Sequence, residues 1–150
     1  MKVVERSAIV GFSTESMFAL VEDVESYPRF LPWCRRTEVE LRDEQRTVAT
    51  LFVDYRGVRQ SFTTENLREA PQLIDIRLVR GPFRRLDGRW RFTALREDAC
   101  KVELALAYQL ASPVLSRLVG PVFDGIANTM VDAFVRRADA VYSGDGSCGT

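Results

Sequence analysis

The chain has 150 residues, 46 % of them hydrophobic, which is enough for one domain with a single core. Its formal net charge is zero, but the charges are unevenly distributed along the chain. The absence of histidine excludes Ser-His-Asp and Cys-His catalytic arrangements, and the three scattered cysteines lack the spacing of zinc ligands.

The first third of the chain is predicted to hold a strand, a short helix and an irregular apolar segment. Residues 2–10 are typical of a strand, and Ser13 can cap a helix over 14–24. The stretch DVESYPRFLPWCRR (23–36) contains two prolines, so it cannot form one regular helix. This stretch nevertheless carries four large apolar side chains: Tyr27, Phe30, Leu31 and Trp33.

The middle of the chain is predicted to be an antiparallel meander. Runs of alternating polarity indicate six strands, at 37–41, 46–56, 58–67, 73–80, 88–95 and 101–110. Turn signals separate them, among them Gly57 and Gly81-Pro82. In the last strand the apolar side chains all fall on one face, which therefore needs a cover.

A long C-terminal helix over 112–142 supplies that cover. Its apolar stripe repeats at three and four residues: Leu115, Leu118, Val119, Val122, Ile126, Met130, Phe134, Ala138 and Val141. We expect Gly120-Pro121 to kink this helix or to split off its first turns. The predicted fold class is α+β, with helices on one face of an antiparallel sheet. Residues 1–143 form the single domain, and 144–150 are expected to be a flexible tail.

Five stretches, in order and at this spacing, resemble one known family. They are VEDVESYPRFLPWC (21–34), FTTEN (62–66), LVRGPFRRLDGRWRFTAL (78–95), AC (99–100) and GPVFDGIANTMVDAFVRRADAVY (120–142). The family unites the coenzyme Q-binding START-domain proteins with the bacterial ribosome-association toxin RatA, and its members have also been labelled polyketide cyclase/dehydrase.

The resemblance implies the helix-grip fold of START domains and birch-pollen allergens. In that fold a curved antiparallel sheet of about seven strands wraps around a long C-terminal helix, and two short helices follow the first strand. The resemblance also implies an apolar cavity between sheet and helix. The apolar segment 27–33 then either forms a lip at the cavity entrance or only packs in the core.

Strand parity and the helix stripe predict the lining of that cavity. The lining residues expected from this pattern are Leu51, Val53, Phe62, Leu78, Trp90, Phe92, Leu104, Leu106, Val122, Ile126 and Met130. The apolar segment adds Phe30, Leu31 and Trp33, and the bend at Gly81-Pro82 adds Phe83, which is either a cavity wall or a loop anchor. Thr64, Asn66 and Arg80 share the parity of Phe62 and Leu78. They are therefore candidate polar contacts for a ligand, unless they lie in water at strand ends.

Positive charge is concentrated between residues 29 and 96, where fifteen arginines stand against nine acidic residues. Arg84, Arg85, Arg89 and Arg91 offer a surface for RNA or for a membrane. The alternative is that these arginines form the solvated face of a sheet. No run approaches the roughly 20 apolar residues of a membrane span.

The expected function is non-enzymatic binding of a hydrophobic ligand, ubiquinone or a related isoprenoid lipid, in support of respiratory electron transport. The alternative is a RatA-like toxin that binds the large ribosomal subunit, and the third possibility is a polyketide cyclase or dehydrase. We expect no catalytic residue, no metal, no cofactor other than the bound ligand, and no DNA partner. The expected location is the bacterial cytoplasm, with or without transient contact with the inner membrane, since no targeting extension precedes the first strand.

Overall fold

A seven-stranded antiparallel sheet and a 26-residue helix dominate the computed structural model, which describes residues 1–143. The elements in chain order are β1 (Lys2–Val10), α1 (Thr14–Glu22), the 3-10 helix η1 (Val24–Arg29), β2 (Cys34–Arg42), β3 (Arg46–Tyr55), β4 (Val58–Glu69), β5 (Leu73–Arg80), β6 (Phe83–Arg96), β7 (Ala99–Leu110), α2 (Pro113–Ala138) and the π-helical turn η2 (Asp139–Ser143). The tail predicted at 144–150, which includes Cys148, lies outside the described residues.

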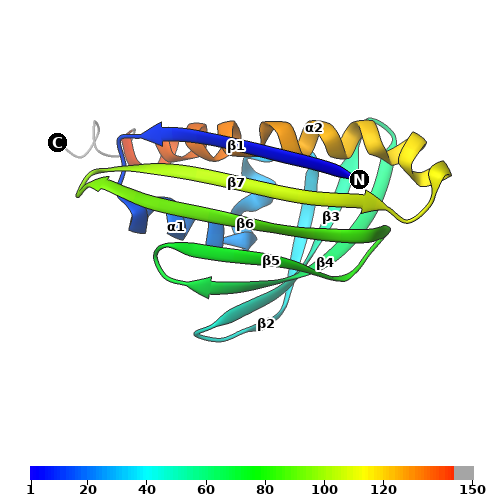
Figure 1. Cartoon of the computed structure of the whole chain (residues 1–150), viewed down its shortest axis with the longest axis horizontal. Coiled ribbons are helices and arrows are strands. Elements are labelled where there is room, and N and C mark those ends of the chain that lie inside the picture. Colours follow the sequence, from blue (N-terminus) through cyan, green and yellow to red (C-terminus); the bar gives the residue numbers. More distant parts are fainter. Residues whose placement is uncertain (144–150) are drawn as a thin grey trace.

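The strands lie in the order β1-β7-β6-β5-β4-β3-β2, and every neighbouring pair is antiparallel. Strands β2 to β7 therefore form the predicted meander, and β1 closes the sheet beside β7. Figure 1 shows α2 running along β1 and β7, while β2, β3 and β4 turn away from the rest of the strongly curved sheet. The predicted α+β helix-grip architecture is confirmed.

Two elements differ most from the sequence prediction, and the bounds of the other strands shift by at most three residues. Strand β6 begins at Phe83, not at residue 88, so Gly81-Pro82 is a tight turn between two long strands. Gly81 has a φ of 154°, and a Cβ placed on it would lie 2.6 Å from Cβ of Phe62, so only glycine fits there. Helix α2 continues through Pro121 and is not split at Gly120.

The buried stripe of α2 is rotated relative to the predicted one. The buried residues are Val119, Gly120, Phe123, Ile126, Ala127, Val131, Phe134 and Ala138. Leu118 is 64 % exposed, and Val122 and Met130 are half-buried. Each step of four residues advances about 40° beyond a full turn, so a stripe built from successive steps of four spirals around the helix. A stripe that stays on one face of the helix needs steps of three residues as well as steps of four. A step of three from Gly120 places Phe123 in the buried stripe.

Aromatic side chains fill the space between α2 and the sheet. Phe123 lies 4.8 Å from Phe83 and 4.7 Å from Tyr108, measured between ring centroids. Phe134 lies 5.3 Å from Trp90 in the same way. The interior beneath α2 is therefore packed by rings rather than left as a broad cavity.

Candidate functional site

A cleft of about 580 Å³ opens along one flank of α2. Its walls come from the segment between η1 and β2, from the β3–β4 turn and from α2. The lining residues are Phe30, Leu31, Pro32, Trp33, Tyr55, Arg56, Pro121, Val122, Gly125, Ile126, Thr129, Ala133, Arg136, Arg137 and Ala140. A volume of this size lies within the range of roughly 300–1,000 Å³ that is usual for small-molecule sites.

Polar contacts hold the opposite flank of α2 against the sheet. Lys2 Nζ lies 3.4 Å from Asp124 Oδ2, and the Tyr108 hydroxyl donates to Oδ1 of the same carboxylate. One turn further on, the guanidinium of Arg6 donates to Asn128 Oδ1. Because β1 and β7 are fixed to this flank of α2, the helix is separated from its neighbours along its other flank. The cleft lies there.

The segment between η1 and β2 is anchored, so it forms a fixed wall of the cleft. Tyr27 is buried in the core and its hydroxyl donates to the carbonyl of Val21. The amide of Leu31 donates to the carbonyl of Tyr27 at 2.9 Å, and the carbonyl of Trp33 accepts from the amide of Asp54 at 3.0 Å. Leu31 and Trp33 are only 1 % and 4 % exposed, so they present little surface to the cleft. The segment therefore packs in the core and also forms part of the cleft wall.

Only five of the fifteen predicted lining residues line the cleft: Phe30, Leu31, Trp33, Val122 and Ile126. Val53, Phe62 and Phe83 instead line a separate small void of about 10 Å³. The other seven, Leu51, Leu78, Trp90, Phe92, Leu104, Leu106 and Met130, pack in or against the core. In place of the expected broad cavity between sheet and helix, the structure has a filled interior, and the open cleft lies beside it. The interior is filled because the rings of Tyr108, Phe123 and Phe134 occupy it. These three residues were not part of the predicted lining.

The three predicted polar contacts do not line the cleft. Thr64 is buried and its hydroxyl donates to Asn66 Oδ1 at 3.2 Å. Arg80 is exposed and pairs with Glu40. A β-bulge explains its position, because Thr63 pairs with Arg80 whereas Thr64 pairs with Leu78, which takes Arg80 out of the parity of Leu78.

Sequence reasoning missed most of the helical wall of the cleft. Gly125, Thr129 and Ala133 follow one another at steps of four and carry small side chains, which leave room beside α2. This small-residue face is visible in the sequence, but large apolar residues dominated the predicted stripe. Arg136 and Arg137 belong neither to that stripe nor to the predicted lining.

The ionisable groups with shifted pKa values near the core lie outside the lining of the cleft. Burial, and then the bond with Asp124, raise the pKa of Tyr108, and burial raises the pKa of the Cys34 thiol to about 11. Within residues 1–143 no group of three potential ligands could hold a metal ion. What the cleft offers is apolar surface, the hydroxyls of Tyr55 and Thr129, and three guanidinium groups.

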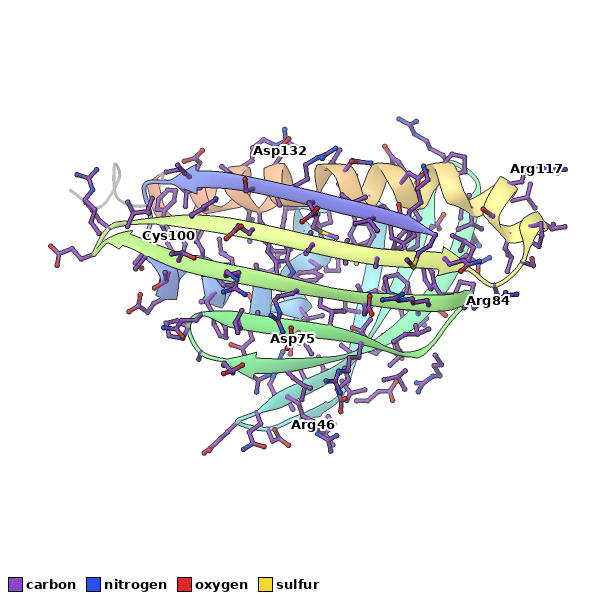
Figure 2. All side chains as sticks on the ribbon, in the orientation of Figure 1. Arg46, Asp75, Arg84, Cys100, Arg117 and Asp132 are labelled. Carbon is purple, nitrogen blue, oxygen red and sulfur yellow. The ribbon has the colours of Figure 1, made fainter. Side chains whose placement is uncertain are left out.

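The four predicted surface arginines are all exposed on β6. Arg85 pairs with Asp87 at 3.2 Å, and Arg89 pairs with Asp75 at 2.6 Å. Arg84 and Arg91 form no ion pair with another described residue. Figure 2 shows Arg84 at the end of the molecule where α2 begins, the end that also carries Arg117.

The segment Pro113–Tyr142 is long and apolar enough to cross a membrane by length and hydropathy alone. Its buried residues, however, pack against the sheet, as expected for the core helix of this fold. The hydropathy of the segment therefore reflects its place in the core.

A family model described as polyketide cyclase / dehydrase and lipid transport matches residues 10–135. The chain belongs to this family. Among its relatives, the ribosome association toxin RatA of Vibrio cholerae is 45 % identical over 142 residues, which cover 95 % of this chain and 99 % of the relative. RatA of Pseudomonas aeruginosa is 42 % identical, with 93 % and 96 % covered.

A more distant relative in the same superfamily is the mitochondrial coenzyme Q-binding protein homolog B of Xenopus laevis. It is 30 % identical over 145 residues, which cover 91 % of this chain and 57 % of the relative. Both branches of the predicted family resemblance are therefore present among the relatives, and the resemblance is confirmed.

Solved structures of other proteins share the fold at low sequence identity. A protein from Thermus thermophilus matches with a TM-score of 0.81 and 20 % identity, covering 94 % of this chain and 99 % of that one. The Zhui aromatase/cyclase of a Streptomyces species matches with a TM-score of 0.80 and 17 % identity, covering 95 % and 98 %. At these identities the likeness shows the fold and not the activity.

Proposed function

We propose that this protein binds a hydrophobic small molecule in the cleft beside α2, an isoprenoid quinone or a similar lipid, without chemical turnover. The observation that carries this proposal is the open volume of about 580 Å³, whose accessible apolar lining comes from Phe30, Pro32, Tyr55, Val122 and Ala133. Removing apolar surface from water contributes roughly 25 cal/mol per Å², so such a lining favours an apolar ligand. The lipid-transport description of the family and the name of the Xenopus relative support the same ligand class.

The shape of the cleft suits a chain-like ligand. Its helical wall extends from Pro121 to Ala140, which corresponds to roughly 30 Å at about 1.5 Å per residue. The filled interior leaves no room beneath α2, so the ligand would lie alongside the helix, with part of its surface facing solvent.

The side chains in the cleft support binding rather than catalysis. General acid–base catalysis needs a positioned group that can exchange a proton near neutral pH. The lining carries no carboxylate or thiol among the described residues, and the Thr129 hydroxyl already donates to the carbonyl of Gly125 at 2.7 Å. A cyclase or dehydrase reaction would have to use Tyr55 or the arginines alone.

Mass spectrometry of lipids extracted from the purified protein tests this proposal. We expect one lipid species at a molar ratio near that of the protein, enriched over the lipid composition of the host membrane. A protein that carries no enriched lipid and shows no saturable binding of a short-chain ubiquinone would contradict the proposal.

Association with the large ribosomal subunit is the second candidate function. It is favoured by the relatives named RatA, which match nearly the whole chain at 45 % and 42 % identity. Arg84 and Arg91, which have no ion-pair partner among the described residues, could contact RNA phosphates directly. The cleft and β6 are separate surfaces, so the two functions are compatible.

A further inference from the structure

Three arginines line the apolar cleft: Arg56 on the β3–β4 turn, and Arg136 and Arg137 in the last turns of α2. No aspartate or glutamate lies among its described lining residues. The formal charge of the whole chain is zero, so this concentration of like charge around an apolar surface is local.

Two of these guanidinium groups lie against aromatic rings of the cleft wall. Cζ of Arg137 is 5.2 Å from the ring centroid of Phe30, and Cζ of Arg56 is 5.0 Å from that of Tyr55. Cation–π contacts of this kind hold the positive charge close to apolar surface rather than free in solvent. A ligand that packs on Phe30 would therefore meet the Arg137 guanidinium as well.

Some arginines outside the cleft are paired with acidic side chains, whereas others, such as Arg84 and Arg91, are not paired with any described residue. Arg42 pairs with Glu25 at 2.7 Å, and Arg46 pairs with Glu65 at 2.7 Å. Arg56, Arg136 and Arg137 form no ion pair with an acidic side chain of the described residues. Their hydrogen-bond donors are thus available to an anion that enters the cleft.

The backbone of Arg56 adds a second observation. Arg56 has a φ of 51° and is followed by Gly57 with a φ of 80°, so both central residues of this hairpin turn are left-handed. Asparagine, aspartate or glycine is favoured at the first of these positions. The chain instead holds a long cationic side chain in a strained conformation at the edge of the cleft, and strain of this kind concentrates at ligand-binding sites.

We infer that the ligand of the cleft is an anionic amphiphile. Its carboxylate or phosphate head group binds Arg136 and Arg137, and its single apolar chain packs on the half-buried side chains of Phe30 and Val122. Arg56 contributes a third positive charge to the same cleft. This inference rests on the proposed function and, within its class of lipid ligands, selects an anionic lipid over a neutral quinone.

A purely structural role accounts for only part of these observations. Arg136 and Arg137 lie in the last turn of α2, where cations interact favourably with the C-terminal end of the helix dipole. That interaction does not explain the position of Arg137 over Phe30, and it has no bearing on Arg56, which is not on a helix.

Calorimetric titration with three ligands of equal chain length tests the inference: dodecanoate, dodecyl phosphate and dodecanol, each below its micelle concentration. We expect the wild-type protein to bind at least one of the anions about tenfold more tightly than dodecanol, because charge-assisted hydrogen bonds are stronger than neutral ones. The ratio of dodecanoate to dodecyl phosphate affinity then distinguishes a carboxylate from a phosphate head group.

The double variant Arg136→Gln/Arg137→Gln should bind all three ligands with the affinity of dodecanol, and Arg56→Gln should lose a smaller part of the anion preference. Arg117→Gln, which removes a charge from α2 outside the lining of the cleft, should leave the preference unchanged. Equal melting temperatures would show that the variants are folded.

The inference is overturned if dodecanol binds as tightly as the anions, or if the double variant keeps the preference. In that case binding of dodecanol or of a short-chain ubiquinone leaves the proposed function standing. If none of these ligands and no ubiquinone binds, the proposed function fails together with the inference. Loss of ribosome association in the double variant, with an unchanged anion preference, would assign these arginines to RNA and also overturn the inference.

Discussion

The ring of Phe30 packs edge-on against the ring of Phe134, with 5.1 Å between their centroids. Tyr27 contacts Phe134 in the same manner at 5.4 Å, so the irregular segment after α1 is joined to the long helix through one aromatic residue. Phe30 is half-buried and turns its remaining surface to the cleft. The wall of the cleft is therefore set by core packing before any ligand arrives, which lowers the cost of ordering it on binding.

Replacing Phe30 by alanine should weaken ligand binding and lower the free energy of unfolding by about 2 kcal/mol, since truncation of a fully buried phenylalanine costs about 3–5 kcal/mol. Urea unfolding and a ligand titration measure the two effects. Phe52→Ala is the matched control, because Phe52 is also half-buried and lies under Arg36 outside the cleft. Equal loss of affinity in both variants would mean that Phe30 contributes only to stability.

The contact between Tyr108 and Asp124 should stabilise the flank of α2 opposite the cleft. Tyr108→Phe removes one hydrogen bond and should lower the free energy of unfolding by about 1 kcal/mol, because Asp124 still forms its ion pair with Lys2. Asp124→Ala leaves the buried Tyr108 hydroxyl without its acceptor and should cost about 2 kcal/mol. In a double-mutant cycle measured by urea unfolding, the double variant should lose less free energy of unfolding than the two single variants lose together. Strict additivity would show that the two side chains do not interact.

Stability should fall at alkaline pH because of Cys34. Burial raises the pKa of its thiol from 9.0 to about 11, so the folded state keeps a proton that the unfolded chain releases first. The stabilisation is complete below pH 9 and is lost as the pH rises from 9 to 11. The raised pKa values of Tyr27 and Tyr108 add a further loss above pH 10.

Urea unfolding of the wild type and of Cys34→Ala at about pH 8 and about pH 10.5 measures this effect. We expect a smaller decrease in the free energy of unfolding between the two pH values for Cys34→Ala than for the wild type. An identical decrease in both proteins would show that Cys34 does not contribute to the loss of stability at alkaline pH. The tyrosines would then account for that loss.

If the protein associates with the large ribosomal subunit through β6, the arginines without ion-pair partners should matter most. Arg84→Gln/Arg91→Gln should reduce co-sedimentation with large subunits several-fold, and wild-type association should weaken steeply with salt, because contacts with phosphates release counterions. Arg85→Gln/Arg89→Gln should have a smaller effect, since Asp87 and Asp75 already neutralise these two charges. Absence of wild-type co-sedimentation at low salt would rule out this surface.

The order of the strands could be predicted from the sequence because each alternating run is followed by a short turn, which leaves few topologies other than a meander. The position of Arg80 could not be predicted, since one bulge opposite Thr63 and Thr64 changes the parity of the strand end. Parity holds only while the register is continuous.

The place of the cleft also escaped sequence reasoning, because it depends on volumes contributed by several elements. Phe83, Phe123 and Tyr108 come from three different elements, and only their mutual packing shows that the interior is filled. The sequence indicated only that the segment around Phe30 and Trp33 is not a regular helix, because of its prolines, and left open whether it forms an entrance or packs in the core.

The central claim, ligand binding in the cleft, is tested most directly at Gly125. A Cβ on this residue meets no atom within 4 Å, so a larger side chain starts into the open cleft without a clash at its first atom. Gly125→Ala and Gly125→Leu should both stabilise the helix by up to about 1 kcal/mol.

Titration of wild type, Gly125→Ala and Gly125→Leu with a short-chain ubiquinone and with dodecanoate, followed by calorimetry, is the decisive measurement. We expect saturable binding of at least one ligand by the wild type and by Gly125→Ala, and a loss of at least about tenfold in Gly125→Leu, with no decrease in melting temperature. Undiminished binding by Gly125→Leu would place the ligand elsewhere, and no binding by the wild type would contradict the ligand-binding function itself.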